Sequence, residues 1–384
     1  MQDQRRATPR TDHVLADPAL REAASRLGRP LVKEAVAAAL ARCRAGEVTP
    51  SDVPLVALAT LPPVATRLRR VVNATGVIVH TNLGRAPLSA AAVDALSVAA
   101  GATDIELDLA TGRRGRRGRS ALDALSAAVP EAGDVHVVNN GAAALALVTV
   151  ALAAGGRNIV VARGEMVEIG DGFRIPELIE SVGGTLREVG TTNRVRASDY
   201  EDAVGEDTAF VLKVHPSNFV VTGFTSTVSV AQLSALPVPV VADIGSGLLT
   251  SHLRLPDEPS AATSLKAGAA LVTASGDKLL GGPQCGLLLG DAHLVHALRR
   301  HPFARALRVD KLTLAALEAT LTGPPPPVVA ALSSSPEDLM ARAEKISVEL
   351  AGMVAASPVV SSAAVGGGGA PGVEIPSAAV AVPA

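Results

Sequence analysis

Short runs of β-branched and aliphatic residues alternate with alanine-rich stretches throughout the chain from Val71 onward. The connections between most of these runs are long enough to hold a helix, as crossovers between parallel strands require. This alternation predicts an α/β fold with a mainly parallel seven-stranded sheet, and ligands of such folds bind at the carboxyl ends of the strands. The runs that predict strands lie at residues 135–138, 158–162, 185–189, 209–214, 238–242, 270–274 and 285–289.

The first 70 residues differ from the rest in pattern and in charge. They carry 12 basic and 7 acidic residues, a net charge of +5, whereas the whole chain of 384 residues has a net charge of −2. Pro18 and Gly46 bracket a stretch that predicts two short helices, and a proline-punctuated linker follows it. We therefore expect three domains: a helical module at 1–70, a catalytic domain at 71–309 and a C-terminal α/β subdomain at 310–384.

Composition excludes several classes of protein. Apolar residues make up 48% of the chain and charged residues 19%, so the chain is not intrinsically disordered. The amino terminus has no apolar signal segment, and the longest apolar stretch, residues 142–154, is too short to span a bilayer. Two cysteines are too few for a disulfide framework or a cysteine-rich zinc site. We expect a cytoplasmic protein with no membrane partner, no DNA partner and no metal.

The segment Ser275-Gly-Asp-Lys278 follows a predicted strand and precedes a glycine pair. A lysine at the end of a strand, framed by small residues, suits a Schiff base to pyridoxal 5'-phosphate, because lysine amines react with aldehydes when their surroundings lower the pKa. Ser275 is expected to donate a hydrogen bond to the phosphate of that cofactor. The alternative is a surface lysine in a turn.

Two further segments support the same chemistry. Asp243 ends a predicted strand, where its carboxylate would pair with the protonated pyridine nitrogen; the alternative is a helix N-cap. Asn140, Gly141 and Ala142 open an alanine-rich helix, whose free N–H groups form an anion site, although any ordinary helix begins in this way. The three segments occur in this order, each at the end of a strand, which makes a chance arrangement improbable.

Arginines form a second group of candidates. Arg85, Arg305 and Arg308 are interpreted as ligands of a phosphate-like anion, because guanidinium groups suit such anions. The run from Gly112 to Arg119 contains five arginines, of which four are interpreted as a solvated loop or an RNA-contacting patch, and Arg119 is assigned to neither class.

Other polar residues follow predicted strands or lie near the lysine segment. His215 is predicted to contact the cofactor, and Glu165 and Glu168 are expected either to contact it or to cap a helix. Cys285 lies beside the glycine pair and is interpreted as a buried structural thiol.

Several long strings resemble the bacterial L-seryl-tRNA(Sec) selenium transferase family, the selenocysteine synthases. The resemblance spans about residues 12–380 in consistent order. The strings that carry it are NATGVIVHTNLGRAPL at 73–88, ARGEMVEIGDGFRIPE at 162–177, EVGTTNR at 188–194, KVHPSNF at 213–219, ADIGSG at 242–247, SGDKLLGGPQ at 275–284 and HPFARALRVDKLTLAALEATL at 301–321.

The resemblance implies a fold-type-I pyridoxal-phosphate enzyme that converts L-seryl-tRNA(Sec) to L-selenocysteinyl-tRNA(Sec) with selenophosphate. The reaction would proceed by β-elimination to an aminoacrylate and addition of selenium. The resemblance implies Lys278 as the Schiff-base lysine, Asp243 as the pyridinium partner, and Arg85, Arg305 and Arg308 as ligands of selenophosphate. It also implies a homo-oligomeric ring, a decamer in the family, and an N-terminal domain that binds the tRNA.

The sequence departs from the family pattern in its last part. The segment between Leu321 and Glu337 is short and rich in proline, and the chain stops at Ala384, so we expect a shortened C-terminal subdomain. Two other interpretations are a paralogous pyridoxal-phosphate lyase, acting on a small amino acid or amino sugar acid, and an inactive truncated remnant. The N-terminal helical module favours the transferase over the lyase.

Overall fold

The computed structural model describes residues 7–170 and 172–383. The basic residues Arg5 and Arg6, Asp171 in one of the family strings, and the end of the chain at Ala384 lie outside these ranges. Contacts within the chain divide it into two compact units, Met1–Val72 and Asn73–Ala384, which are described separately. The domain boundaries at residues 70 and 309 stay predictions.

The first unit is a bundle of short helices: α2 (Thr11–Leu15), α3 (Pro18–Leu27), α4 (Arg29–Arg44) and α5 (Val53–Thr60). Asp17 caps α3, since its Oδ1 accepts hydrogen bonds from the N–H groups of Ala19 and Leu20 at 2.9 and 3.2 Å. Gly28, at φ 90°, lets the chain turn directly from α3 into α4. A small core holds the bundle together; it includes Leu20, Val32, Val36, Leu40 and Val53.

The prediction of a linker after residue 46 is wrong in part. Residues Pro50–Asp52 form a 3-10 turn and Val53–Thr60 form α5. Each of the two prolines, Pro50 and Pro54, lies in the first turn of its helix, where a missing N–H costs nothing. Val53 and Ala57 are buried in the bundle core, so packing stabilises a segment that its prolines suggest is irregular.

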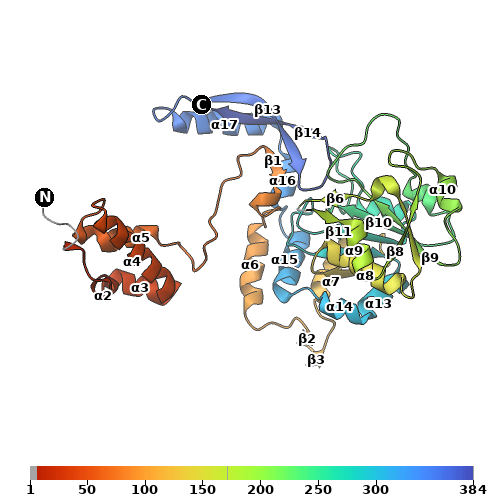
Figure 1. The fold of residues 1–384 in the computed structure, drawn as a ribbon, viewed down its shortest axis with the longest axis horizontal. Coiled ribbons are helices and arrows are strands. Elements are labelled where there is room, and N and C mark those ends of the chain that lie inside the picture. The colour runs from red at the N-terminus through yellow and green to blue at the C-terminus, as the bar shows by residue number, and fades with distance from the viewer. Residues whose placement is uncertain (1–6, 171, 384) are drawn as a thin grey trace. The chain divides into compact units, whose positions relative to one another are not determined.

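The second unit is built on a seven-stranded sheet with the order β4-β12-β11-β10-β9-β5-β8 (Figure 1). Six strands are parallel, and β12 is antiparallel to both of its neighbours, which confirms the mainly parallel sheet. The strands are β4 (Asp134–Val138), β5 (Asn158–Ala162), β8 (Thr185–Val189), β9 (Thr208–Val214), β10 (Val240–Gly245), β11 (Leu271–Ser275) and β12 (Gly286–Gly290).

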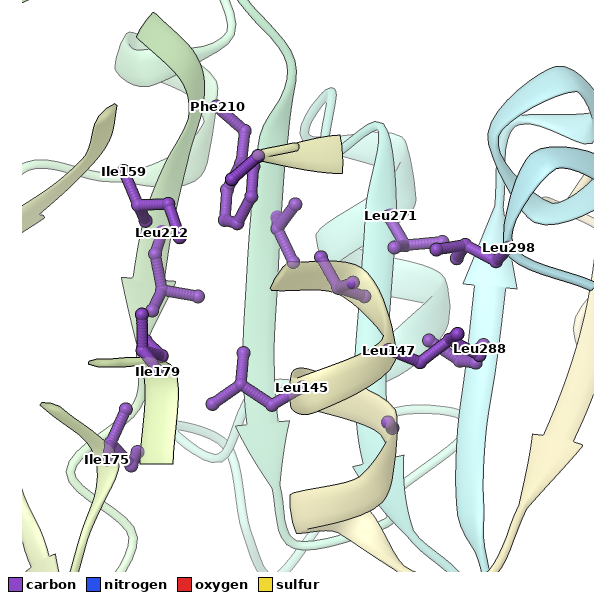
Figure 2. Close-up of a cluster of buried hydrophobic side chains, with 14 of the residues drawn as sticks. Leu145, Leu147, Ile159, Ile175, Ile179, Phe210, Leu212, Leu271, Leu288 and Leu298 are labelled. Atoms are coloured by element: carbon purple, nitrogen blue, oxygen red, sulfur yellow. The ribbon is translucent and has the colours of Figure 1, made fainter. Parts of the chain in front are cut away.

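Helices cover both faces of this sheet and bury its aliphatic side chains. One face carries α8 (Gly141–Leu152), α9 (Ile175–Ser181), α13 (Ala292–Arg300) and α14 (Pro302–Ala306). Figure 2 shows Leu145 and Leu147 of α8 packed toward the strand residues Phe210, Leu212 and Leu288. The other face carries α7 (Arg119–Ala128), α10 (Ala197–Glu201), α11 (Val230–Leu233) and α12 (Ala261–Lys266), with α6 (Ala90–Ala100) and α15 (Lys311–Thr322) outside α7.

A smaller three-stranded sheet joins the beginning and the last part of this unit. It has the order β1 (Val77–Val79), β13 (Ser357–Gly366) and β14 (Glu374–Ala381), and α17 (Pro336–Leu350) packs on β13 and β14. α16 (Pro327–Ser333) packs on β1. Short hairpins add β2 (Leu107–Asp108) with β3 (Arg113–Arg114), and β6 (Glu168–Ile169) with β7 (Phe173–Arg174).

α17 ends at Leu350, and the Gly- and Ser-rich stretch from residue 361 begins inside β13, where its small residues pair with β14. β14 is an edge strand of the three-stranded sheet. In the ranges 7–170 and 172–383 no helix is long and apolar enough to cross a membrane.

Candidate active site

Lys278 lies in the connection between β11 and β12, at the carboxyl end of the parallel strands. Lys278 is only 8% exposed. Burial lowers the pKa of its amine, and the charge of Asp243 opposes this shift. The backbone holds it in a tight loop, because Leu279 N–H donates to Ser246 O and Gly281 N–H donates to Lys278 O. A lowered pKa favours the neutral, nucleophilic form of the amine, which formation of a Schiff base requires.

Asp243 lies on β10, directly beside β11. The pairing register places it opposite Thr273, whose hydroxyl donates a 2.7 Å hydrogen bond to Asp243 Oδ1. Burial raises the pKa of Asp243 above its ordinary value. Asp243 also lines a cavity, so a cation that enters there would find an acceptor and favour the charged carboxylate. Because its side chain bonds to Thr273 within the sheet, Asp243 is not a helix N-cap.

The amino terminus of α8 lies at the same edge of the sheet. Asn140 caps the helix by accepting the Ala143 N–H at 2.8 Å, and the first-turn residues Gly141 and Ala142 have no acceptor within the helix. Ser275 packs against this turn so closely that a Cβ on Gly141 would lie 2.6 Å from Ser275 Oγ. The hydroxyl and the helix N-terminus therefore converge on one place, as an anion site requires.

His215 follows β9 and lines the same cavity as Asp243. Its backbone N–H donates to Asp243 O at 2.9 Å, which continues the β9–β10 pairing by one residue. Its ring Nε2 lies 3.1 Å from Oε2 of the buried Glu258. His215 is thus held through its backbone by Asp243 and through its ring by Glu258, at the strand end that adjoins Asp243.

Arg85 reaches the lysine loop from the start of the unit. Its Nη1 donates to Asp277 Oδ2 at 2.8 Å, and Asp277 is the residue before Lys278. Arg85 is one of two non-glycine residues with positive φ in the described part of the chain, at 65°. Asp277 Oδ1 is buried and has no hydrogen-bond partner among the residues described, so the pair can accept one further donor.

Residues 366–369 form a glycine-rich segment that begins at the end of β13 and lies against the lysine. A Cβ on Gly368 would lie 3.1 Å from Lys278 Nζ, and one on Gly369 would lie 3.0 Å from Leu279. Gly368 has φ 75°, in the left-handed region that favours glycine. Only a chain without side chains here lets the backbone approach the amine so closely.

The cavity that Asp243 and His215 line has a volume of about 680 Å³. It is lined by Asp243, His215, Glu258 and Ala370, among others, but Lys278, Ser275 and the α8 amino terminus are not part of its lining. The residues of the candidate site lie far apart in the sequence, from 85 to 370, and the fold brings them to one edge of the sheet.

Arg305 and Arg308 lie in a different place from Lys278. They line a second cavity of about 520 Å³ together with Arg116, Arg117 and Glu106. Arg308 forms an ion pair with Glu106, which also accepts from Arg114 and Arg117. The structure therefore does not bring these two arginines into contact with Arg85, and their role as ligands of the same anion stays a prediction.

The remaining candidates have partners of their own. Arg119 pairs with Asp108 at 3.5 Å. Buried Glu165 pairs with Lys213 and accepts the Val214 N–H at 3.0 Å, so its carboxylate does not cap a helix. It lines the same cavity as Asp243, and its contact with the cofactor stays a prediction. Cys285 is fully buried, and burial raises the pKa of its thiol to about 12, as expected of a structural thiol.

The residues present fit pyridoxal phosphate. The buried amine of Lys278, the carboxylate of Asp243 with its free side toward a cavity, and the N-terminus of α8 next to Ser275 supply an amine, a partner for the ring nitrogen and a phosphate site. Asp277, Glu258 and Thr273 also belong to this site, although the sequence analysis did not select them. Only the position of Asp277 beside Lys278 could have pointed to one of them.

Comparison with known proteins agrees with this chemistry. Residues 71–384 match the family model described as L-seryl-tRNA selenium transferase, and residues 5–44 match the one described as selenocysteine synthase N terminal. The L-seryl-tRNA(Sec) selenium transferase of Solidesulfovibrio magneticus is 45% identical over 85% of this chain and 72% of its own length. That of Geobacter sulfurreducens is 41% identical over 97% of this chain and 87% of its own length.

One solved structure shows the same fold. D-Glucosaminate-6-phosphate ammonia-lyase superposes with a TM-score of 0.57 at 20% sequence identity, covering 80% of this chain and 78% of that one. From the match over residues 71–384 and the identity to these relatives, the chain belongs to the L-seryl-tRNA(Sec) selenium transferase family, the pyridoxal-phosphate-dependent selenocysteine synthases.

Proposed function

We propose that this chain converts serine, esterified to tRNA(Sec), into selenocysteine, with selenophosphate as the selenium donor. The observation that supports the proposal is the buried Lys278 amine, at the same edge of the sheet as Asp243 and the N-terminus of α8, in a member of this family. A pyridoxal-phosphate enzyme of this kind needs each of these three groups at one strand edge.

The cofactor, when bound, supplies an electron sink for the α-carbon of the amino acid. Lys278 then acts as the general base, because burial favours its neutral form and a neutral Nζ can accept the α-proton. Asp243 holds the positive charge at the ring nitrogen, and Thr273 fixes the orientation of its carboxylate. The first turn of α8 and the Ser275 hydroxyl bind the phosphate group.

The selenium donor is proposed to bind to arginines. Arg85 is held next to Lys278 through Asp277, which places one guanidinium beside the base. Arg305 and Arg308 supply further positive charge from the second cavity, where Glu106 holds Arg308 until an anion competes for it. Guanidinium groups suit the tetrahedral oxyanion of selenophosphate because they can form two parallel hydrogen bonds to it.

The remaining partners are proposed from the resemblance and from charge. The helical unit at the amino terminus binds the tRNA, in agreement with the net charge of +5 on residues 1–70. The protein assembles into a homo-oligomeric ring of ten copies and works in the cytoplasm. Light scattering of the purified protein measures the mass of the assembly directly, and a monomer would contradict the ring.

The proposed function is tested on the purified full chain supplied with pyridoxal phosphate. Borohydride reduction followed by peptide mapping should find the cofactor on Lys278, and Lys278→Ala should abolish both the covalent link and turnover. Seryl-tRNA(Sec) with selenophosphate should then yield selenocysteinyl-tRNA(Sec). Cofactor on Lys278 with turnover of a free small amino acid, and none of seryl-tRNA(Sec), would instead identify a lyase. No cofactor on Lys278 in folded protein would support the inactive remnant.

Arg308→Ala provides a separate prediction about the donor. The side chain lies in the second cavity, away from Lys278, so the substitution should raise the KM for selenophosphate about tenfold or more and leave the cofactor in place. Steady-state kinetics with selenophosphate as the varied substrate measure the effect, and Arg300→Ala, in the same cavity, is the matched control. Loss of the covalent cofactor in Arg308→Ala would contradict the assignment.

A further inference from the structure

Glu258 is a buried carboxylate that the chemistry described so far does not use. It is 6% exposed and lies in the loop between β10 and α12. Its Oε2 lies 3.1 Å from His215 Nε2 and accepts the backbone N–H of Ala370 at 2.7 Å. Its Oε1 is buried and has no partner among the described residues. One oxygen atom therefore joins a strand end of the large sheet to the C-terminal subdomain.

The two groups that Glu258 joins both lie at the proposed cofactor site. His215 follows β9 and bonds through its backbone to Asp243. Ala370 follows the glycine-rich segment 366–369, in which Gly368 approaches Lys278 Nζ. Glu258 is also close enough to Lys278 for its charge to act on that amine, in the direction that raises the pKa of Lys278.

Ala370 needs a restraint of this kind. It has φ 45°, in the left-handed region that L-residues other than glycine rarely adopt. A backbone in this conformation persists when its surroundings determine it, and the hydrogen bond to Glu258 is the contact that holds the Ala370 N–H. The glycines before it have too much conformational freedom to hold the segment in place by themselves.

We propose that Glu258 is a positioning residue that locks the glycine-rich segment and the His215 imidazole together over Lys278. The hydrogen bonds of Oε2, rather than the negative charge, perform this task. A side chain of the same length with an acceptor at Oε2 should therefore preserve it, and a shorter acid should not, because it reaches only one of the two partners. The unpartnered Oε1 leaves room for an NH₂ group in its place.

Three variants of the full chain separate reach from charge. Glu258→Gln keeps the length and one acceptor oxygen, Glu258→Asp keeps the charge but is one methylene shorter, and Glu258→Ala removes both. Hydrogen exchange of the Ala370 amide, followed in peptides that span residues 366–372, reads the first contact. The ring-nitrogen chemical shifts of His215 read the second. Neither measurement needs substrate.

We expect a mild effect on exchange in Glu258→Gln and severe effects in Glu258→Asp and Glu258→Ala. Exchange at Ala370 should accelerate about tenfold or more in Glu258→Asp and Glu258→Ala and less than about threefold in Glu258→Gln, because each lost hydrogen bond frees the segment. Glu344→Gln, an exposed glutamate on α17, is the matched control and should behave as wild type. Unchanged exchange in Glu258→Ala, or a wild-type result in Glu258→Asp, would overturn the proposal.

A kinetic measurement extends the test and rests on the proposed function. In Glu258→Asp and Glu258→Ala, kcat should fall about tenfold to a hundredfold with a smaller change in KM, and Glu258→Gln should restore most of it. A wild-type enzyme that does not turn over seryl-tRNA(Sec) would contradict the proposed function and leave the exchange result standing. A loss of kcat in Glu258→Gln but not in Glu258→Asp, with normal exchange in both, would assign Glu258 a charge role and contradict positioning.

Discussion

At the scale of single residues, burial shifts the pKa values of Lys278 and Asp243 in opposite directions. Both shifts favour the uncharged form of the group. Burial lowers the pKa of the amine and raises that of the carboxyl group, so both groups are pushed toward their neutral forms. Each opposes this effect in the other by its own charge. Burial of this kind favours a neutral, reactive amine, and a cation beside Asp243 would favour its charged carboxylate.

His136 gives a prediction at the same scale. Burial, aided by Arg299 and Arg116, lowers the pKa of His136 from 6.5 to about 4. Because the folded pKa is below the unfolded one, stability is lost as the pH falls from about 6.5 toward about 4. At pH 5 the cost is about 2 kcal/mol. The fall in thermal midpoint between pH 7 and pH 5 should therefore shrink in His136→Gln.

The control for His136 is His293→Gln, an exposed imidazole on α13. It should show the pH dependence of the wild type. If His136→Gln loses as much thermal stability between pH 7 and pH 5 as the wild type does, His136 is not the group that titrates.

At the scale of elements, the site depends on segments that approach it without side chains. The glycine-rich segment 366–369 can approach Lys278 and the strand β1 because it has no Cβ atoms. A Cβ at any of its positions would crowd a neighbouring residue. A Cβ on Gly366 would lie 2.2 Å from Val77 Cγ1, and one on Gly367 would lie 2.4 Å from Val79 Cγ1. The same compactness that makes the segment a close cover makes it intolerant of substitution.

Gly368→Ala tests this cover, with Gly352→Ala as its matched control. Both glycines have positive φ, 75° and 93°, but a Cβ on Gly368 would lie 3.1 Å from Lys278 Nζ, whereas one on Gly352 meets nothing within 4 Å. Both variants should lose about 1 kcal/mol of stability from backbone strain. Only Gly368→Ala should also impair attachment of pyridoxal phosphate to Lys278, measured by borohydride trapping. Equal trapping in the two variants would show that the segment does not restrict the amine.

Much of the element pattern could be predicted from the sequence, since strands and long helices have strong periodic signals. All seven predicted strands exist within about three residues of their predicted bounds. α5 was missed because Pro50 and Pro54 suggest a linker, although each lies in the first turn of its helix. The contacts of Glu258 and Asp277 could not be predicted, because they depend on residues 112 and 192 positions away in the chain.

At the scale of the whole molecule, the chain consists of two units with different charge. Residues 1–70 have a net charge of +5 and the whole chain has a net charge of −2, so the remaining residues have a net charge of −7. A polyanion such as tRNA is attracted by the first unit and repelled by the second as a whole, apart from local arginine clusters. Under the proposed function, substrate capture and chemistry belong to different parts of one chain, which can be separated experimentally.

Deletion of residues 1–72 should remove most of the affinity for tRNA and leave the covalent attachment of pyridoxal phosphate to Lys278 intact. In the full chain, the logarithm of the binding constant should fall linearly with the logarithm of salt concentration, because bound phosphates release counterions. Fluorescence anisotropy with labelled tRNA at several salt concentrations measures both effects. An undiminished affinity in the shortened chain would place the tRNA contacts on the second unit.

The pairing of β1 with β13 also sets an order of events during synthesis on the ribosome. Val77 pairs with Ala364, so β1 waits for roughly 290 further residues before its partner is made. At about 5–20 residues per second, that delay is roughly a quarter of a minute to a minute. Lys278, Asp243 and α8 leave the ribosome earlier than the segment that covers them. A nascent chain therefore exposes its reactive amine before it can enclose a cofactor, and translation itself sets the earliest moment at which the enzyme can mature.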